Sequence, residues 1–344
     1  MVLRSLIAAA AILAVGAPLG AQAPMGQSDE GWTWTADRPD ANGRLGVFGV
    51  RALAAGELDL QYRFSQTNYQ GIYIGTDSLG LEEVLQRYQN APLTRSEVVH
   101  DVRLRLGITD RLTLLARGGF AAYERETTTA TSMVRVGVNE LTDAEVGLLY
   151  NVYGDGPYRL DFQAGAVIPT MAGNTTYGPT SANTVGELSY DMRTSAGTVG
   201  VIGAIGGNVQ NEVGSLGAKM QARVFVGESD AGYTPGDQYE ANGWAAYNVN
   251  DHLSVLAGIR WQSWGNIEGA DPDLDAMADP HNEGRTLSGQ HALLPLGLNL
   301  VIPGESVLAG HILSLEAVYP LHRDLESPQL GVDWGLNLGY RMTF

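Results

Sequence analysis

Charged side chains occupy alternate positions in several short segments, where they could form ion pairs or bind a small ion. In the clearest segment, Asp101, Arg103 and Arg105 alternate with Val102 and Leu104. Alternate residues of a β-strand point to the same face, so these charges share one face and the apolar residues share the other. The candidates for an ion-binding or solute-conducting site on such faces are Arg63, Arg103, Arg105, Glu145, Asp161, Arg223, Glu240, Arg260 and Arg341.

Three of these arginines belong to neighbouring segments and predict a basic stripe. Arg63 lies in the first segment, and Arg103 and Arg105 lie in the second. Such a stripe would favour anions or polar aromatic solutes, because guanidinium groups bind carboxylates and stack on aromatic rings. The alternative is that the stripe pairs with acids and serves only the structure. The acids expected on the same face are Asp59, Asp101 and Asp333.

The elements that position these charges are predicted to be β-strands. Twelve segments alternate apolar and polar residues, and the last runs from Gly331 to the C-terminal Phe344. A full-length strand that is apolar on one face and polar on the other is typical of outer-membrane barrels, whose strands face lipid on one side and a polar interior on the other. We predict an all-β transmembrane antiparallel up-and-down β-barrel of about twelve strands. Tyr340 and Phe344 are expected to form its C-terminal assembly signal.

Short and long connections alternate along the chain. Turns such as Thr109-Asp110-Arg111 follow the even-numbered segments, whereas longer stretches follow the odd-numbered ones. Barrels of the bacterial outer membrane have short periplasmic turns and longer extracellular loops. The pattern predicts that the barrel begins and ends on the periplasmic side and that the protein resides in the bacterial outer membrane.

The N-terminal residues have the pattern of a secretory signal peptide from a Gram-negative bacterium. Arg4 precedes the apolar run from Leu6 to Val15, and Ala21-Gln22-Ala23 is a small-residue cleavage pattern. The run is shorter than the roughly twenty residues of a membrane helix, and no later segment is longer, so a helical membrane protein is excluded. The expected divisions are a signal peptide over 1–23, a periplasmic N-terminal segment over 24–56 and the barrel over 57–344. The segment after the signal peptide could dock under the barrel, enter it or stay mobile.

The composition excludes several classes of partner and site. The chain has 344 residues, no Cys and a formal net charge of −17. Phosphate contacts need Lys and Arg, so no nucleic-acid partner is expected. Without Cys there is no lipid attachment, disulfide or thiolate chemistry. The expected partners are outer-membrane lipid and lipopolysaccharide, the barrel-assembly machinery and a small-molecule solute, and no cofactor is expected.

One long connection contains a helical pattern. Between 68 and 95, Leu81, Val84, Leu85 and Tyr88 recur at helical spacing. Acidic residues in the first turn support a helix start there. We predict a short amphipathic helix that either caps the barrel rim or constricts its mouth.

The connection after the ninth segment is acidic. Asp271, Asp273 and Asp275 have the alternate spacing that opens a calcium loop. That motif needs Gly at the sixth position and Glu at the twelfth, where this chain has Ala276 and Asn282. The three aspartates are therefore a partial match, and no metal site is predicted.

Several stretches resemble a known group of proteins. They are GVFGVRALAAGELDLQYRF, the helical stretch before Pro92, the turn ITDRLTL, and GDQYEANGWAAYNVNDHLSV followed by GADPDLDAMADPHNEG. Over most of its mature length the chain is similar to a group of outer-membrane transporter barrels that lie near the MetA-pathway-of-phenol-degradation barrels. The resemblance implies a barrel that moves a small solute. Members are rich in Met and His around the first strand, whereas this chain has Leu58, Leu60, Gln61 and Phe64, which argues against a metal cargo.

The sequence therefore predicts an outer-membrane channel or transporter for small solutes, acting by passive diffusion or export. The alternatives are a surface enzyme of the lipase or protease type and a non-conducting scaffold or receptor barrel. A hydrolase would need a His with a Ser or paired acids. The pairs His252 with Ser254 and His311 with Ser314 fall at the predicted periplasmic turns. We predict that the protein is not an enzyme and that it forms a porin-like channel with a narrow lumen.

Overall fold

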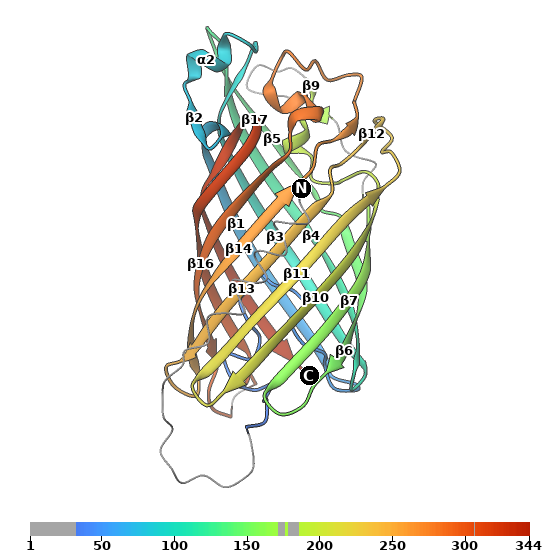
Figure 1. Cartoon of the computed structure of the whole chain (residues 1–344), viewed down its shortest axis with the longest axis vertical. Coiled ribbons are helices and arrows are strands. Elements are labelled where there is room, and N and C mark those ends of the chain that lie inside the picture. The colour runs from blue at the N-terminus through green and yellow to red at the C-terminus, as the bar shows by residue number, and fades with distance from the viewer. Residues whose placement is uncertain (1–31, 171–175, 178–185, 306) are drawn as a thin grey trace.

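The wall of the molecule is a closed ring of antiparallel β-strands (Figure 1). This computed structural model describes residues 32–170, 176–177, 186–305 and 307–344. The predicted signal peptide over 1–23 lies outside the described residues. Within them, no helix is both long enough and apolar enough to cross a membrane.

Eleven strands make up the ring among the described residues, and the pairing of β17 with β1 closes it. In ring order they are β1 (Leu58–Gly75), β3 (Ala91–Thr109), β4 (Leu112–Thr128), β6 (Ala144–Tyr153), β7 (Tyr158–Ile168), β10 (Val199–Asn211), β11 (Gly214–Val226), β13 (Gln238–Asn248), β14 (Leu253–Trp264), β16 (Gly289–Val301) and β17 (Ile312–Thr343). Two further strands join its edge, β2 (Asp77–Leu79) beside β1 and β5 (Met133–Leu141) beside the upper part of β4. Short pairs link β8 (Thr176–Tyr177) with β9 (Gly186–Glu187) and β12 (Tyr233–Thr234) with β15 (Glu268–Gly269).

Strand β17 crosses the wall twice. Its first part, from Ile312 to Leu325, pairs with β16, and its second part, from Leu325 to Thr343, pairs with β1. Every pairing around the ring is antiparallel, so the two parts of β17 run in opposite directions. The chain therefore crosses the wall twelve times, and the predicted twelve-stranded barrel is confirmed.

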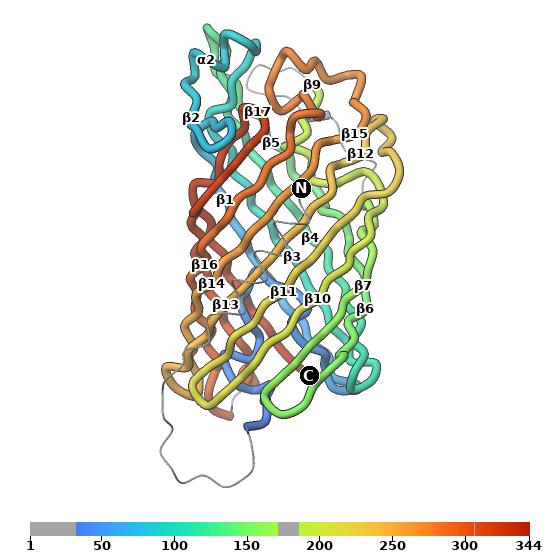
Figure 2. Tube along the Cα trace, viewed as in Figure 1, coloured from blue at the N-terminus to red at the C-terminus, as the bar shows by residue number. Residues whose placement is uncertain are grey.

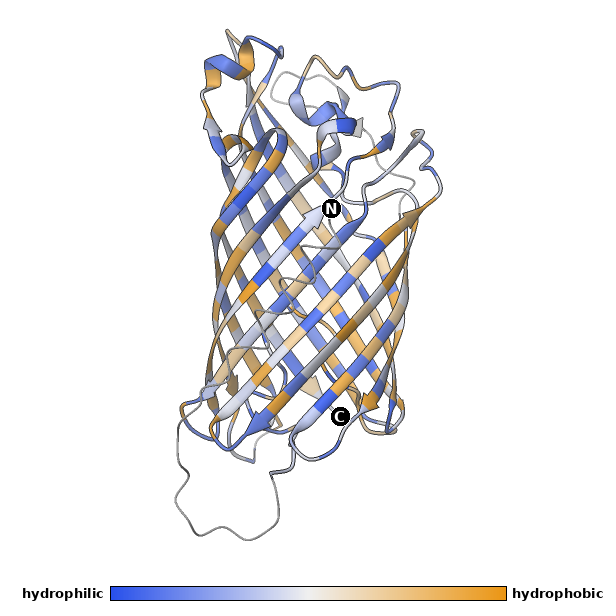
Figure 3. Ribbon diagram, viewed as in Figure 1, coloured by the Kyte–Doolittle hydropathy of each residue, from blue (hydrophilic) through white to orange (hydrophobic). Residues whose placement is uncertain are grey.

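The two faces of the wall differ as the alternation predicts. Phe162 and Leu338 are 50% and 45% exposed on the outer face, whereas Gln163 and Asn337 beside them are buried in the interior. Bands of apolar and polar residues accordingly alternate along the strands (Figure 3). An apolar surface of this extent is unfavourable in water but matches the hydrocarbon of a bilayer. The outer face is thus the lipid-facing surface.

Loop length separates the two ends of the barrel. The connections from β3 to β4, from β10 to β11 and from β13 to β14 are short turns at what we call the short-turn end. Helix α2 (Leu81–Leu85) and the 3₁₀ turns η1 (Tyr190–Met192), η2 (Pro280–Asn282) and η3 (Gly284–Thr286) belong to longer connections at the opposite, long-loop end (Figure 1). The C-terminal Phe344 lies at the short-turn end, where its backbone N–H donates to the Leu58 carbonyl at 2.8 Å.

The predicted amphipathic helix is α2, one turn shorter than the sequence pattern. The Glu83 carboxylate accepts a hydrogen bond from the backbone N–H of Gly80 at 2.8 Å, which satisfies one of the free donors at the helix start. Val84 is buried against Ile72 and Leu330 at the upper ends of β1 and β17. The helix therefore packs on the rim of the barrel.

The interior position predicted for Asp333 is wrong. In the pairing of β1 with β17, Asn68 lies opposite Trp334, but Tyr69 lies opposite Val332. The extra residue on β17 is a β-bulge, which breaks the alternation of faces. Asp333 is exposed and lines a shallow outer hollow together with Trp334 and Tyr319.

Candidate functional site

Residues 34–55 lie inside the short-turn half of the barrel, and we call this segment the plug. It appears as the dark blue trace within the lower part of the ring in Figure 2. Leu45, Val47, Val50 and Leu53 are buried. The plug contains no helix or strand, so its backbone polar groups need partners from the wall.

Side-chain amides of the wall satisfy several plug carbonyls. Asn299 Nδ2 donates to the carbonyl oxygens of Pro39 and Gly43 at 3.0 and 3.2 Å. Asn208 Nδ2 donates to the Val50 carbonyl at 3.0 Å. These bonds hold the backbone of the plug by side chains that point inward from β16 and β10.

Two wall cations also donate to the plug. Arg103 Nη1 donates to the Leu45 carbonyl at 3.1 Å. Lys219 Nζ donates to the carbonyls of Phe48 and Gly49, the second at 3.2 Å. Part of the positive charge of the lumen therefore holds the plug.

One buried ion pair joins the plug to the wall. Arg44 of the plug binds Glu316 of β17 through two contacts, Nε–Oε2 at 3.0 Å and Nη2–Oε1 at 2.8 Å. The two side chains are only 2% and 3% exposed. Asn337 Nδ2 donates to Glu316 at 3.1 Å, and Arg44 also donates to Asn242. The pair is hydrogen-bonded on both sides, which offsets the cost of burying two charges.

The plug is also fitted to the wall by shape. Gly43 has a φ of +62°, and a Cβ placed there would lie 2.9 Å from the Trp244 ring. Trp244 in turn packs against Val47 and Val50. Only glycine combines this left-handed backbone with this close approach.

The predicted basic stripe exists but is paired with acids. Arg63 and Arg103 both bind Asp101, at 2.6 and 2.8 Å. Arg105 binds Asp59 at 2.9 Å, and Arg341 approaches the same carboxylate at 3.4 Å. Two of the three acids that the sequence offers as partners, Asp59 and Asp101, therefore bind the arginines of the stripe.

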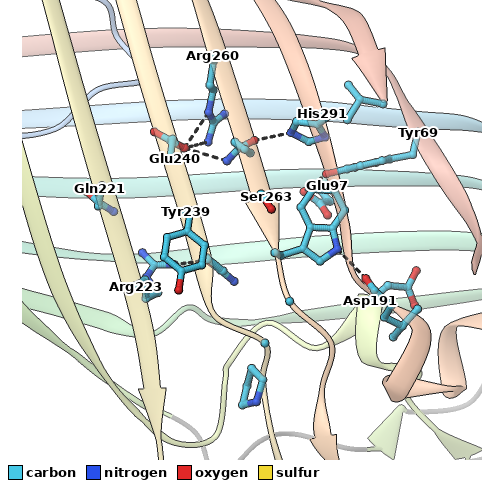
Figure 4. Close-up of a pocket in the computed structure, with 18 of the residues that line it drawn as sticks. Tyr69, Glu97, Asp191, Gln221, Arg223, Tyr239, Glu240, Arg260, Ser263 and His291 are labelled. Atoms are coloured by element: carbon cyan, nitrogen blue, oxygen red, sulfur yellow. Dashed lines mark hydrogen bonds and ion pairs between the residues drawn. The ribbon is translucent and has the colours of Figure 1, made fainter. Parts of the chain in front are cut away.

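Beyond the plug the lumen opens into a cavity of about 520 Å³. Gly46, Val47 and Phe48 contribute to its lining, so the plug forms its floor. The sequence candidates that line it are Arg63, Glu145, Arg223, Glu240 and Arg260. Figure 4 shows Arg223, Glu240 and Arg260 in the lining. The remaining candidates, Arg103, Arg105, Asp161 and Arg341, are buried side chains outside this lining.

The cavity is basic, although the chain as a whole is acidic. Its basic lining residues among those described are Arg63, Arg95, Arg117, Arg193, Lys219, Arg223, Arg260 and Arg323. Its acidic ones are Glu97, Glu145, Asp191 and Glu240. The negative charge of the protein therefore lies mainly outside the cavity.

A polar network surrounds Glu240 on one side of the cavity (Figure 4). Arg260 Nη2 binds this carboxylate at 2.6 Å, and Gln262 Nε2 donates to it at 2.8 Å. The ring of His291 lies 2.6 Å from Gln262 Oε1. Arg260 and Glu240 thus neutralise one another within the lining.

Loops from the long-loop end line part of the cavity, and we call η1 and η2 with Asp279 the loop cap. Arg125 binds Asp191 of η1 at 2.7 Å and Asp279 at 2.6 Å, which joins two loops to β4. Burial by itself would raise the pKa of Asp191. The neighbouring Arg125, His281 and Arg95 lower it by more than burial raises it, so the pKa lies well below its usual range. Asp191 is therefore ionised at neutral pH and binds the arginine.

The acidic loop does not present its aspartates together. Asp271 accepts from Arg193 Nη2 at 2.6 Å and from the Asp273 N–H at 2.9 Å. No group of three or more His, Cys, Asp or Glu side chains in the described part of the chain is arranged to hold a metal ion.

Neither of the His and Ser pairs considered for hydrolysis is joined by a hydrogen bond in the described part of the chain. His311 Nδ1 lies 2.5 Å from the Tyr340 hydroxyl. Ser314 donates to Asn299 Oδ1 at 2.7 Å, and Ser254 is fully buried. Tyr340 of the predicted C-terminal signal is thus half-buried, whereas Phe344 is exposed.

Sequence reasoning missed several lining residues. Arg95, Tyr69 and Arg323 line the cavity but fall in stretches that the sequence assigns to loops. Strands β1 and β3 extend through Gly75 and from Ala91, so their upper parts continue the alternation beyond the predicted ends. Arg95 has the same parity as Asp101, Arg103 and Arg105, and this continuation of the charged face is the signal that could have identified it.

Comparison with known proteins identifies the fold. No family model matches the chain, and no curated protein matches it. An outer membrane channel from Pseudomonas putida F1 matches with a TM-score of 0.56 at 13% sequence identity, over 86% of this chain and 98% of that chain. The transport unit of the autotransporter AIDA-I from Escherichia coli gives 0.44 at 10% identity, over 90% and 98%. The toluene transporter TbuX from Ralstonia pickettii gives 0.42 at 12% identity, over 90% and 93%.

Likeness at these levels bears on the fold and carries no solute or activity to this chain. The likeness to the Pseudomonas putida channel confirms the barrel fold that the resemblance implies. Together with the apolar outer face and the closed antiparallel ring, it shows that the chain is a β-barrel of the bacterial outer membrane.

Proposed function

We propose that this protein is an outer-membrane channel for small polar solutes whose lumen is closed at the periplasmic, short-turn end by its own plug. The observation that supports this proposal is the cavity of about 520 Å³ inside the ring, with charged side chains of the wall around it and the plug as its floor. Water-filled channels of outer-membrane barrels have polar interiors of this kind.

The size and lining of the cavity favour a small polar solute. Its volume lies within the range of about 300 to 1,000 Å³ that is usual for small-molecule sites. Arg63 of β1, Arg117 of β4 and Glu145 of β6 line it. A wholly apolar solute would have to displace water from these charges without replacing its hydrogen bonds, which is unfavourable.

The plug is suited to be a movable closure. It makes no strand pairing with the wall, because its backbone is held by side chains such as Asn299 and Lys219. The ring satisfies its own backbone through β1 and β17, so it does not need the plug to remain closed. The plug can therefore leave the lumen without opening the wall.

A non-conducting scaffold barrel is the second candidate, because the buried ion pair between Arg44 and Glu316 holds the plug in the lumen. A permanently seated plug would leave the cavity open only toward the long loops. Transport across the membrane distinguishes the two candidates.

Swelling of liposomes in isotonic solute tests the proposal. The full chain and a variant that lacks residues 34–53 are compared, with folding verified by heat-modifiable migration in gels. We expect slow swelling with the full chain and swelling at least tenfold faster with the folded deletion variant. Equal, background swelling with both would favour the scaffold.

A further inference from the structure

A group of side chains in the cavity lining and directly next to it contains more positive than negative charge. We call it the arginine cluster, and its members are Arg63, Arg103, Arg117, Arg223, Asp101 and Glu145. Asp101 is shared by three arginines, with N–O distances of 2.6, 2.8 and 3.1 Å. Glu145 is shared by Arg117, at 3.7 Å, and Arg223. Four guanidinium groups therefore share two carboxylates.

Neighbouring charges do not cancel this surplus. Glu240 is the next acid in the lining, and Arg260 already binds it at 2.6 Å. Lys219 adds a further positive charge, and its hydrogen bonds go to Gln163 at 2.6 Å and to plug carbonyls. The region around the cluster remains positively charged when these residues are included.

The cluster is held where a solute could reach it. The side chains of Arg63, Arg117 and Arg223 are 13%, 29% and 21% exposed, and all three line the cavity. Nε of Arg223 is buried and has no hydrogen-bond partner among the described residues. Positive charge that is largely withdrawn from water and incompletely paired is costly, and a bound anion would reduce that cost.

The surroundings favour an anion with a carbon skeleton. The guanidinium group of Arg103 lies 5.5 Å above the ring of Phe48, which lines the cavity floor. The cavity is large enough for an organic molecule rather than an ion alone. Guanidinium groups match the planar, two-oxygen geometry of a carboxylate.

We propose that the arginine cluster binds the carboxylate group of a small organic acid, so that the solute class of the channel is organic anions. The carboxylate would lie against Arg117 and Arg223, with the remainder of the molecule in the cavity. This inference rests on the proposed function, because it names the solute that the channel would admit.

Titration calorimetry on the refolded full chain tests the inference, with three probes. Benzoate carries the carboxylate, benzyl alcohol is the neutral molecule with the same ring, and inorganic phosphate is an anion without a carbon skeleton. We expect benzoate to bind at least tenfold more tightly than benzyl alcohol and more tightly than phosphate. Equal binding of benzoate and benzyl alcohol, binding of phosphate alone, or no binding of any probe would overturn the inference.

Two substitutions with opposite expected effects separate binding from structure. Arg223→Gln should weaken benzoate binding at least tenfold, whereas Glu145→Gln should strengthen it, because it removes a competing carboxylate. Arg135→Gln is the matched control, since Arg135 forms an exposed ion pair with Glu126 on β5 and β4. If Arg223→Gln does not fold, Arg117→Gln replaces it. Weaker binding in both Arg223→Gln and Glu145→Gln would show a structural role and refute the proposal.

The binding site and the proposed transport function can be refuted independently of each other. A barrel that admits solutes into liposomes but does not prefer benzoate would refute this inference and leave the proposed function standing. A barrel that binds benzoate but admits nothing would refute the proposed function and keep the binding site.

Discussion

Arg44 and Glu316 form a two-contact ion pair in the interior of the barrel, with N–O distances of 3.0 and 2.8 Å. The arginine belongs to the plug and the glutamate to β17, which lie far apart in the sequence. Because both side chains are almost fully buried, separating them would leave each charge without its oppositely charged partner. This pair therefore links the position of the plug directly to the barrel wall.

Breaking the pair from one side should loosen the plug. Arg44→Met leaves Glu316 buried and unpaired, and the expected cost is about 3 to 5 kcal/mol in the free energy of unfolding. The double variant Arg44→Met with Glu316→Met should cost less than the single one, since no charge is left buried. Urea unfolding in vesicles measures both, and a double variant no more stable than Arg44→Met would contradict the assignment.

The glycine at the closest approach of plug and wall should be sensitive to substitution. Gly43→Val places a branched side chain on a backbone with a φ of +62°. The Cβ of that side chain would lie 2.9 Å from the Trp244 ring. Strain in that backbone region costs of order 1 to 3 kcal/mol. We expect faster cleavage of the plug by added protease. Gly304→Val is the control, with a positive φ but open space around it, and equal cleavage in the two variants would argue against the contact.

The charges of the cavity should set ion selectivity, whereas Asp333 should not. Glu240→Gln removes a negative charge from the lining and should shift the reversal potential of the plug-deleted barrel toward anions. Asp333→Asn removes a charge of the same sign from the exposed bulge and should leave it unchanged. An equal shift in both variants would place Asp333 in the lumen after all.

The loop cap should respond to acid only below the usual range of a carboxyl group. The pKa of Asp191 is lowered in the folded protein. As the pH falls, Asp191 is therefore protonated in the unfolded cap at a higher pH than in the folded cap. Its contribution to stability is complete above the unfolded pKa of about 3.9 and is lost as the pH falls through the lower folded value. Proteolysis of the loops should be constant from pH 7 to about 5 and should rise only in strong acid. Asp191→Asn should raise it at neutral pH as well, and a transition between pH 6 and 7 would contradict this account.

The outer face should not tolerate charge. Phe162→Arg places a guanidinium group on the lipid-facing surface, where the cost reaches about 2 to 4 kcal/mol near the middle of the bilayer. Phe162→Leu keeps the face apolar and should cost much less. Refolding yield and urea unfolding in vesicles compare the two variants, and equal stability would mean that this residue does not face lipid.

The wall of the barrel could be predicted from the sequence because its determinants are local. Neighbouring residues such as Phe162 and Gln163 point to opposite faces of the strand. Lipid on one side of the wall makes this apolar–polar alternation strict. Pairing of the stripe with Asp59 and Asp101 was also one of the predicted alternatives. Asp333 departs from the pattern because a bulge adds one residue and reverses the parity beyond it.

The plug and the loop cap could not be predicted in the same way. Arg44 lies in a stretch without periodicity, and its partner Glu316 is determined by the closed barrel rather than by neighbouring sequence. Leu115 and Leu149 are apolar residues that face inward against Gly49 of the plug, so alternation alone would misassign the polarity of that region. Asp191 meets Arg125 only because loops from different strands converge at one end.

Single-channel recording in planar bilayers tests the central claim most directly, because it reports on the plug and the lumen in the same barrel. The full chain should be closed most of the time, and the variant lacking residues 34–53 should show discrete, long-lived openings with a preference for anions. A full chain that conducts as steadily as the deletion variant, or a folded deletion variant that never opens, would contradict the account.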